Sequence, residues 1–431
     1  MRTREEIRSL TDKILKMAEP HVAQIYYSWE KSTATRFGEN AITQNMGGEQ
    51  ENLRIEIYNG LRKGSMATNK LDDNSLKNFV EVAVKMSQDA PEDPELMEIL
   101  GPQEYTDGPK AFFEDTANLA PEKIASDAGV VVDMAKAKGY RASGLFEASA
   151  VISAIANVKG LFCIEDNTEV DYSTTVHGPK GSGKGFMNRS SYRDIDIEKI
   201  ANMAVGNAEM AQNPGDIETE DWTVIFEPLA VADILGFMVW NLSARDADEG
   251  TTFFAGKLGE KMFSEKVDIS IVTDDPELPP MLFGLDGLPI KPKKIVEKGV
   301  LKRLKHDRFW ADKKGEEPDA VFLPLSMKGE DNTIDDLVKS CKKGLLVKNL
   351  WYIRYVDRKE LLLTGMTRDG VFLVEDGKIV GPVKNMRWNE SPVVFLKNIV
   401  AMSRAERIDS RVKLPGIMSE GFTFSSKTES L

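Results

Sequence analysis

The chain has little cysteine, little histidine and no apolar run of membrane-spanning length. Among its 431 residues there are two cysteines, Cys163 and Cys341, which stand far apart and form no CxxC pair. This excludes a disulfide framework and a cysteine-based zinc site, and it suits a reducing compartment. The first twenty residues are charged throughout, unlike a signal peptide. We therefore expect a cytoplasmic protein without membrane association.

Histidine is equally sparse, and this limits the chemistry that the sequence can show. The three histidines, His21, His177 and His306, are isolated from one another, and no HExxH, HxH or Cys-His spacing occurs. A local zinc motif is therefore absent, and no GxSxG nucleophile setting is present either. Distant histidines can still meet in space. This leaves open the hypothesis of an autonomous hydrolase whose site is not visible in the sequence.

The charge balance argues against nucleic acid as a partner. The chain has 56 basic and 69 acidic residues, a net charge of −13. Such a charge repels phosphate backbones. One stretch, residues 292–306, is locally basic, and an alternating-charge surface explains it. We expect no nucleic-acid partner.

A glycine-rich stretch, "HGPKGSGKGF" at residues 177–186, comes close to a phosphate-binding loop. Gly178, Gly183 and Lys184 have the required spacing, but Gly185 stands where the loop needs Ser or Thr. The residues before it alternate as in a half-exposed strand, and no helical period follows at once. The stretch therefore predicts a hairpin turn.

The first part of the chain, residues 1–110, predicts a helix, an antiparallel sheet and a second helix. The opening helix is amphipathic, and residues 23–69 alternate as successive strands with turns expected at 38–40, 47–48 and 59–60. A helix is expected from about Asp73. The acidic, proline-rich residues 88–109 are interpreted as a linker.

Two further domains are expected, at residues 111–215 and 216–431. The middle one opens with a helix at Pro121, continues with strands at about 140–149, 150–158, 161–166 and 168–177, and closes with a helix at 197–212 capped by Asp196. The last one holds an apolar helix at 229–244 and many strand signals, with turns at 368–370 and 375–377. The fold class is therefore α+β: helix–antiparallel sheet–helix layers, then a β-rich, barrel-like C-terminal domain.

Several blocks together resemble the TldD/PmbA family, described as modulators of DNA gyrase and as zinc metallopeptidases. They are "GSGKGFMNRSSYRDID", "DADEGTTFFAGKLGEKMFSEKVDISIVTDDP", "GLDGLPIKPKKIVEKGVLKRLKHDRFWA" and "LLLTGMTRDGVFLVEDGKIVGPVKNMRWNESPVVFL". With the strand region at 23–69 they cover nearly the whole chain, in the family's order.

The chain departs from this family at the metal site. Active members carry HExxxH on the helix before the "GTTFFAGKLGE" segment, whereas no histidine occurs here between Gly178 and Lys305. No metal-ligating or catalytic residue is therefore carried over, and we expect no cofactor in this chain. The window that replaces the motif consists of Leu235, Gly236, Phe237, Met238, Val239 and Trp240.

The resemblance implies a non-catalytic subunit of the TldE/PmbA type. Its expected partner is a TldD-type homologue that bears HExxxH and holds the zinc, or a second copy of itself, and its expected substrates are unfolded or small peptides. A protein-binding modulator of DNA gyrase is the other alternative. We expect the window residues Leu235, Phe237, Met238 and Trp240 to fill core volume. We expect the strands flanking residues 364–377 to offer backbone edges to an extended peptide.

Overall fold

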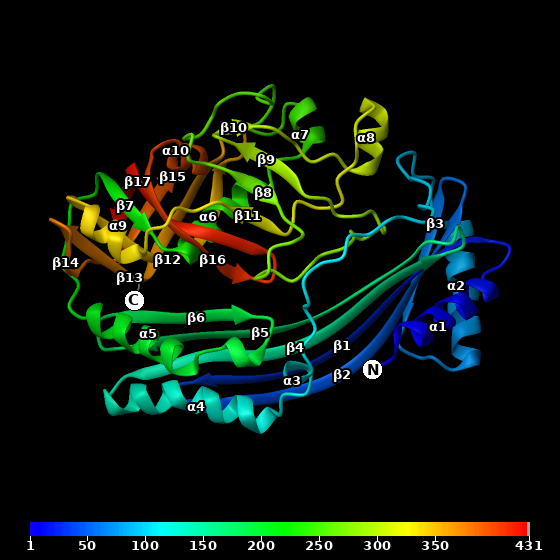
Figure 1. The fold of residues 1–431 in the computed structure, drawn as a ribbon, viewed down its shortest axis with the longest axis horizontal. Coiled ribbons are helices and arrows are strands. Elements are labelled where there is room, and N and C mark those ends of the chain that lie inside the picture. The colour runs from blue at the N-terminus through cyan, green and yellow to red at the C-terminus, as the bar shows by residue number, and fades with distance from the viewer. Residues whose placement is uncertain (429–431) are drawn as a thin grey trace.

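Two sheets carry the fold (Figure 1). The computed structural model describes residues 1–428. The first sheet has six antiparallel strands in the order β3-β2-β1-β4-β5-β6, and the second has eleven strands. In the second sheet β17 pairs with both β15 and β7, which closes five strands into a ring. The expected α+β class with a barrel-like C-terminal part is confirmed.

The first sheet begins with three antiparallel strands of unequal length. They are β1 (Val22–Gly38), β2 (Ala41–Asn59) and β3 (Arg62–Thr68). The turns expected near 38–40 and 59–60 are confirmed. The turn expected at Gly47-Gly48 is wrong, because β2 runs through it in register with Ser32 and Thr33 of β1. β3 pairs with β2 only from Leu53 onward, so the outer edge of residues 41–52 has no partner strand among residues 1–428.

Two amphipathic helices cover one end of this sheet. α1 (Arg4–Met17) is fixed by a capping box at Thr3, and α2 (Asp73–Asp89) is capped by Asp72. Their buried faces repeat at helical spacing and pack on β1 and β2. No regular element occurs between α2 and α3 (Glu114–Ala117), which suits the linker expected there.

The same sheet continues with longer strands than the sequence indicated. The four short strands expected over 140–177 are two, β4 (Arg141–Asn157) and β5 (Phe162–His177), and β6 (Ser182–Arg189) follows the glycine-rich turn. The predicted hairpin is confirmed, since β5 and β6 pair up to the His177–Ser182 position. β4 pairs with β1 along its length, so the first two expected domains share one sheet. Their boundary stays a prediction.

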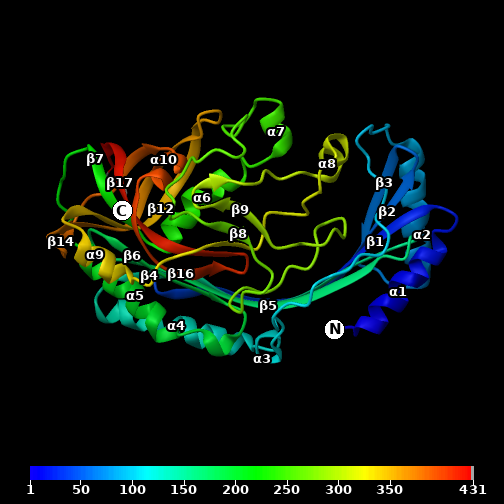
Figure 2. The same cartoon turned by 45° about the horizontal axis from the view of Figure 1, so that its top comes forward.

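Helices α4 (Pro121–Ala137) and α5 (Ile197–Met210) lie on one side of the long sheet, and the C-terminal part lies on the other (Figure 2). α5 begins after its cap Asp196, as predicted. It approaches β6 closely: a Cβ on Gly183 would lie 2.2 Å from the backbone nitrogen of Ala208, and one on Gly185 would lie 2.2 Å from the carbonyl oxygen of Ile200.

The C-terminal part consists of many short elements around the ring. They are β7 (Asp221–Phe226), α6 (Pro228–Val239), α7 (Ala244–Asp248), β8 (Ile269–Ile271), β9 (Lys293–Glu297), β10 (Val300–Leu301), α8 (Arg308–Lys314), β11 (Leu325–Met327), α9 (Ile334–Ser340), β12 (Lys343–Asp357), β13 (Leu362–Glu375), β14 (Lys378–Pro382), β15 (Met386–Glu390), α10 (Pro392–Lys397), β16 (Ile399–Asp409) and β17 (Val412–Lys427).

Two sequence-based expectations for this part need correction. The turn expected at 368–370 is a bulge inside β13, where Asp369 (φ 55°) and Gly370 (φ 124°) shift the register against β12. The helix expected over 229–244 ends at Val239, and a second short helix follows. The turn at 375–377 is confirmed. Within residues 1–428 no helix is both long enough and apolar enough to cross a membrane.

The contact of α5 with β6 gives a stability prediction. We expect Gly185→Val to lower the free energy of unfolding by about 3 kcal/mol, because the added atoms meet the backbone of Ile200. Gly206→Ala on α5, the helix that Gly185 of β6 faces, is the control, since a Cβ at position 206 meets nothing within 4 Å. It should stabilise the protein by about 0.5–1 kcal/mol. Urea unfolding measures both, and equal effects would contradict this packing.

Candidate functional site along α6

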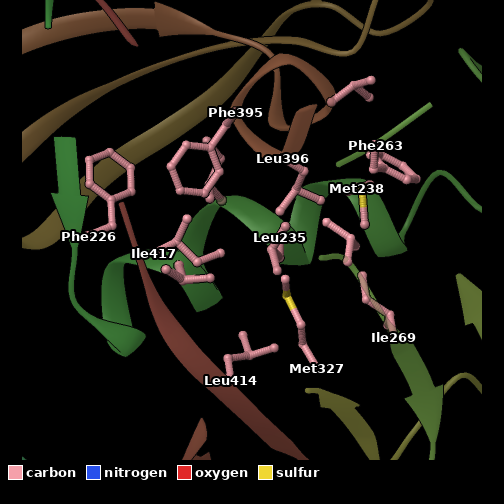
Figure 3. Close-up of a cluster of buried hydrophobic side chains, with 14 of the residues drawn as sticks. Phe226, Leu235, Met238, Phe263, Ile269, Met327, Phe395, Leu396, Leu414 and Ile417 are labelled. Atoms are coloured by element: carbon pink, nitrogen blue, oxygen red, sulfur yellow. The ribbon is translucent and has the colours of Figure 1, made fainter. Parts of the chain in front are cut away.

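Helix α6 has a buried face that belongs to the core of the C-terminal part. Its buried residues include Ile234, Leu235 and Met238, each at most 1% exposed. Figure 3 shows Leu235 and Met238 among apolar side chains from several strands and from α10. Two window residues therefore do fill core volume, as the sequence predicted. Neither side chain is a metal ligand in this setting.

The opposite face of α6 is open. Its partly exposed residues recur at helical spacing: Leu229, Ala232, Asp233, Gly236 and Phe237, with Trp240 after the last turn. Trp240 is 70% exposed. The expectation that Trp240 packs in the core is therefore wrong, whereas Phe237 is partly buried and packs against the core. Their rings contact each other at 5.3 Å between centroids, and Phe237 also contacts Tyr355.

No metal centre is formed by the described residues. Among residues 1–428 no group of three or more His, Cys, Asp or Glu side chains is placed to hold an ion. The hypothesis that the three histidines converge is wrong, because the full length of strand β4 separates His21 from His177. His21 precedes the end of β1 that pairs with Asn157, whereas His177 pairs with Arg141 at the other end of β4. Seventeen residues of strand separate these ends by roughly 50 Å.

One carboxylate interrupts the apolar open face of α6. Asp233 is largely buried, and burial raises its pKa from 3.8 to about 6. The Lys184 ammonium and the backbone N–H of Leu350 lower the pKa but do not offset burial. Lys184 comes from β6 in the other sheet, so this carboxylate lies between the two halves of the molecule.

A pocket of about 280 Å³ lies at the N-terminal end of α6. Its walls come from both sheets: Lys184 and Phe186 of β6, residues of α5, Glu227 and Leu229 beside α6, and residues of α9, β12 and β16. Glu227 forms an ion pair with Lys348 of β12. Burial raises the pKa of Glu227, and the nearby Lys348 lowers it in part.

Strand β6 is held at both ends by the C-terminal part. Near one end the Ser182 hydroxyl donates to Asp369 Oδ1 (2.7 Å), at the bulge of β13. Near the other end Arg407 Nε donates to Asn188 Oδ1 (2.9 Å). Ser182, Lys184, Phe186 and Asn188 alternate along β6, so Lys184 and Phe186 face the pocket between the two contacts.

The sequence found only one of these pocket residues. Lys184 lies in the glycine-rich stretch, and its only sequence signal is the partial match of that stretch to a phosphate-binding loop. Arg407 and Lys348 lie in ordinary strands, and no local pattern could have connected them. Of the strands that flank residues 364–377, β12 pairs on both sides, with β13 and β7. β14 pairs only with β13 among the described residues, so the expected free edge is present at β14.

Comparison with known proteins adds a family assignment for part of the chain. Residues 219–426 match the model of the PmbA/TldA metallopeptidase C-terminal domain. A protein named metalloprotease from Methanothermobacter thermautotrophicus is 28% identical over 174 residues. That match spans 36% of this chain and only 37% of the length of the relative.

Solved structures share the fold over the whole chain. TldE from Thermococcus kodakarensis superposes with a TM-score of 0.88 at 19% identity, covering 97% of this chain and 100% of that one. A proposed modulator of a DNA gyrase from Thermotoga maritima gives 0.87 at 17% identity, with 97% and 100% covered. Another from Bacteroides thetaiotaomicron gives 0.88 at 19%, with 99% and 100% covered. At these identities the likeness establishes the common fold.

The raised pKa of Asp233 gives a pH prediction. Because the folded-state pKa is above the ordinary value, the stabilising contribution is present below about pH 4 and is lost as the pH rises through 6. Asp233→Asn removes this titration. Between pH 4.5 and 7.5 its stability relative to the unmodified chain should rise by about 1–2 kcal/mol.

Urea unfolding at a series of pH values measures this difference. The exposed Asp312→Asn on α8 is the matched control. A relative stability of Asp233→Asn that stays constant, or falls, with rising pH would contradict the buried position of Asp233.

Proposed function

The chain belongs to the TldD/PmbA family, and from this premise we propose that it is a subunit without a zinc site of its own. It pairs with a TldD-type homologue that carries HExxxH, and the pair processes unfolded or small peptides. Its two cysteines are free and buried, which suits a cytoplasmic setting.

One observation carries this proposal. The helix on which we expect the family's metal motif is α6, and its window consists of side chains that do not bind zinc. Leu235 and Met238 face the core, Gly236 and Phe237 are partly buried, and Trp240 is exposed. A hydrolytic zinc site needs imidazole or carboxylate ligands and a base for the bound water. The fold and the cleft are present, so a role in binding and assembly suits this chain.

We expect the chain to lack peptidase activity alone and to raise the activity of its partner. The experiment mixes it with an HExxxH-bearing homologue and follows cleavage of an unstructured fluorogenic peptide, with gel filtration of each protein and of the mixture. The mixture should elute as one complex and cleave faster than the homologue alone. Zinc analysis of the isolated chain should find no stoichiometric metal.

Two results would overturn the proposal. One is a homologue that cleaves equally fast alone and forms no complex. The other is tightly bound zinc, about one per chain, together with cleavage by the isolated chain. Self-association without binding of the homologue would favour the homodimer instead.

The outer edge of β2 suits the partner surface. Residues 41–48 are all exposed and uncharged, and they include Ile42 (50% exposed) and Met46 (45%). Natural sheets protect long edges with charges, prolines or covering segments, because unpaired backbone groups attract other strands. Among residues 1–428, no strand pairs with that edge. We therefore place a strand of the homologue along residues 41–52.

A charge on this edge should weaken the complex. We expect Met46→Lys to raise the Kd for the homologue at least about tenfold, because a lysine opposes edge-to-edge pairing. Met86→Lys on α2 is the control, since Met86 is similarly exposed at 46%. Both variants should unfold like the unmodified chain. If both variants bind the homologue equally well, the partner surface does not lie at the outer edge of β2.

A further inference from the structure

The pocket between β6 and α6 concentrates positive charge in an acidic protein. Its lining includes five basic residues and two acidic ones, Glu227 and Glu406, whereas the whole chain has a net charge of −13. The basic residues come from four separate elements: Lys184 and Arg189 of β6, Lys199 of α5, Lys348 of β12 and Arg407 of β16. Like charges gathered this way repel one another unless an anion lies among them.

Most of these cations have no anionic partner. Lys348 is paired with Glu227. The other four form no ion pair with any residue of the described part of the chain. Lys184 interacts with two carboxylates, Asp233 and Asp171, only at longer range. The pocket therefore keeps unneutralised positive charge after its internal contacts are counted.

Arg407 is the clearest case. It is 9% exposed, and its hydrogen-bond partners are all neutral: Asn188 Oδ1 at 2.9 Å, Ser190 Oγ at 2.8 Å and the Glu277 carbonyl oxygen at 2.9 Å. Its Nη2 has no partner among the described residues. Its pKa is lowered to about 10, mainly by burial and also by Arg189, while the carboxylates of Glu169, Asp409 and Glu277 act in the opposite direction. A buried guanidinium with carboxylates only at longer range and no direct ion pair is costly, and a nearby anion reduces that cost.

The rest of the lining is mostly apolar, with two amide side chains, Asn207 and Asn349. It includes Phe186, Met203, Leu229, Ile334 and Ile408. A volume of about 280 Å³ suits one or two residues of an extended chain. The ligand that fits these walls has one negative group and an apolar body.

A carboxylate fits better than a phosphate group. Phosphate loops present a run of backbone N–H groups at a helix N-terminus. Here the turn closes on itself, with the Gly178 N–H donating to the Gly181 carbonyl at 2.9 Å, and Lys184 is followed by strand. The pocket offers side-chain cations without such a loop.

We propose that this pocket binds the C-terminal carboxylate of an extended peptide whose last residue is apolar. This rests on the proposed function, because it specifies which end of the peptide this subunit holds. Lys184 and Lys199 attract the carboxylate, Arg407 strengthens the positive potential behind it, and the apolar walls contact the last side chain.

Calorimetric titration of the isolated full chain tests this directly. The probes are N-acetyl-Gly-Gly-Leu with a free carboxylate and the same peptide with a C-terminal amide. The free acid should bind at least about tenfold more tightly, as expected for one charge-assisted contact. Lys184→Ala should weaken binding of the acid about tenfold and leave the amide unchanged. Lys180→Ala, in the hairpin turn outside the pocket, is the matched control.

Lys199→Ala gives a second variant on α5, on an exposed position where folding is not at risk. It should weaken binding of the acid in the same sense. Equal affinity for acid and amide, or no effect of either lysine variant, would overturn the proposal. Tighter binding of inorganic phosphate than of the acid would overturn it in favour of a phosphate ligand.

The outcome is separable from that of the proposed function. No zinc and no partner are needed for this titration. If the chain binds the carboxylate but does not stimulate the homologue, the pocket proposal stands and the subunit proposal is ruled out. If the chain stimulates the homologue but binds acid and amide equally, the subunit role stands and the carboxylate pocket is ruled out.

Discussion

The pairing of β1 with β4 is the constraint on which the remaining structure depends. It runs from Gln24–Asn157 to Phe37–Gly144 and joins two sets of three strands that are separate in sequence. At one end of this pair only glycine fits at position 144, since a Cβ there would lie 2.6 Å from the Phe37 ring. Because this pair occupies the centre, the free edges fall on β2 with β3 and on β6. Both surfaces that we connect with function lie at those edges.

The position of β6 explains why a cleft forms beside α6. The C-terminal part contacts this edge through polar side chains, such as Ser182 with Asp369 and Asn188 with Arg407, and not through a continuous apolar layer. The large cores on either side are separate clusters. Polar contacts at discrete points leave room between them, and charged side chains such as Lys184 remain within reach of water there.

The sequence predicts helices and caps well here, because their signals are local. Pro121 and Asp196 mark helix starts, and Gly-rich residues mark the β5–β6 turn. It fails where the outcome depends on a partner strand: Gly47-Gly48 indicates a turn, but pairing with β1 keeps it extended. Asp369 and Gly370 likewise form a bulge inside a paired strand. The pocket was not predictable, because its cations come from four elements that only the tertiary fold brings together.

The two faces of α6 differ in what they require of the sequence. Core packing fixes the helix through Leu235 and Met238, which needs apolar volume and no chemistry. The opposite face is only partly buried, with Leu229, Ala232 and Phe237 packed against the margin of that core. Even so it keeps Phe237 and a largely exposed Trp240, whose apolar area is unfavourable in water. Stability alone gives no reason for so large an exposed ring at the C-terminal end of α6. Contact with an apolar ligand or partner there would give one.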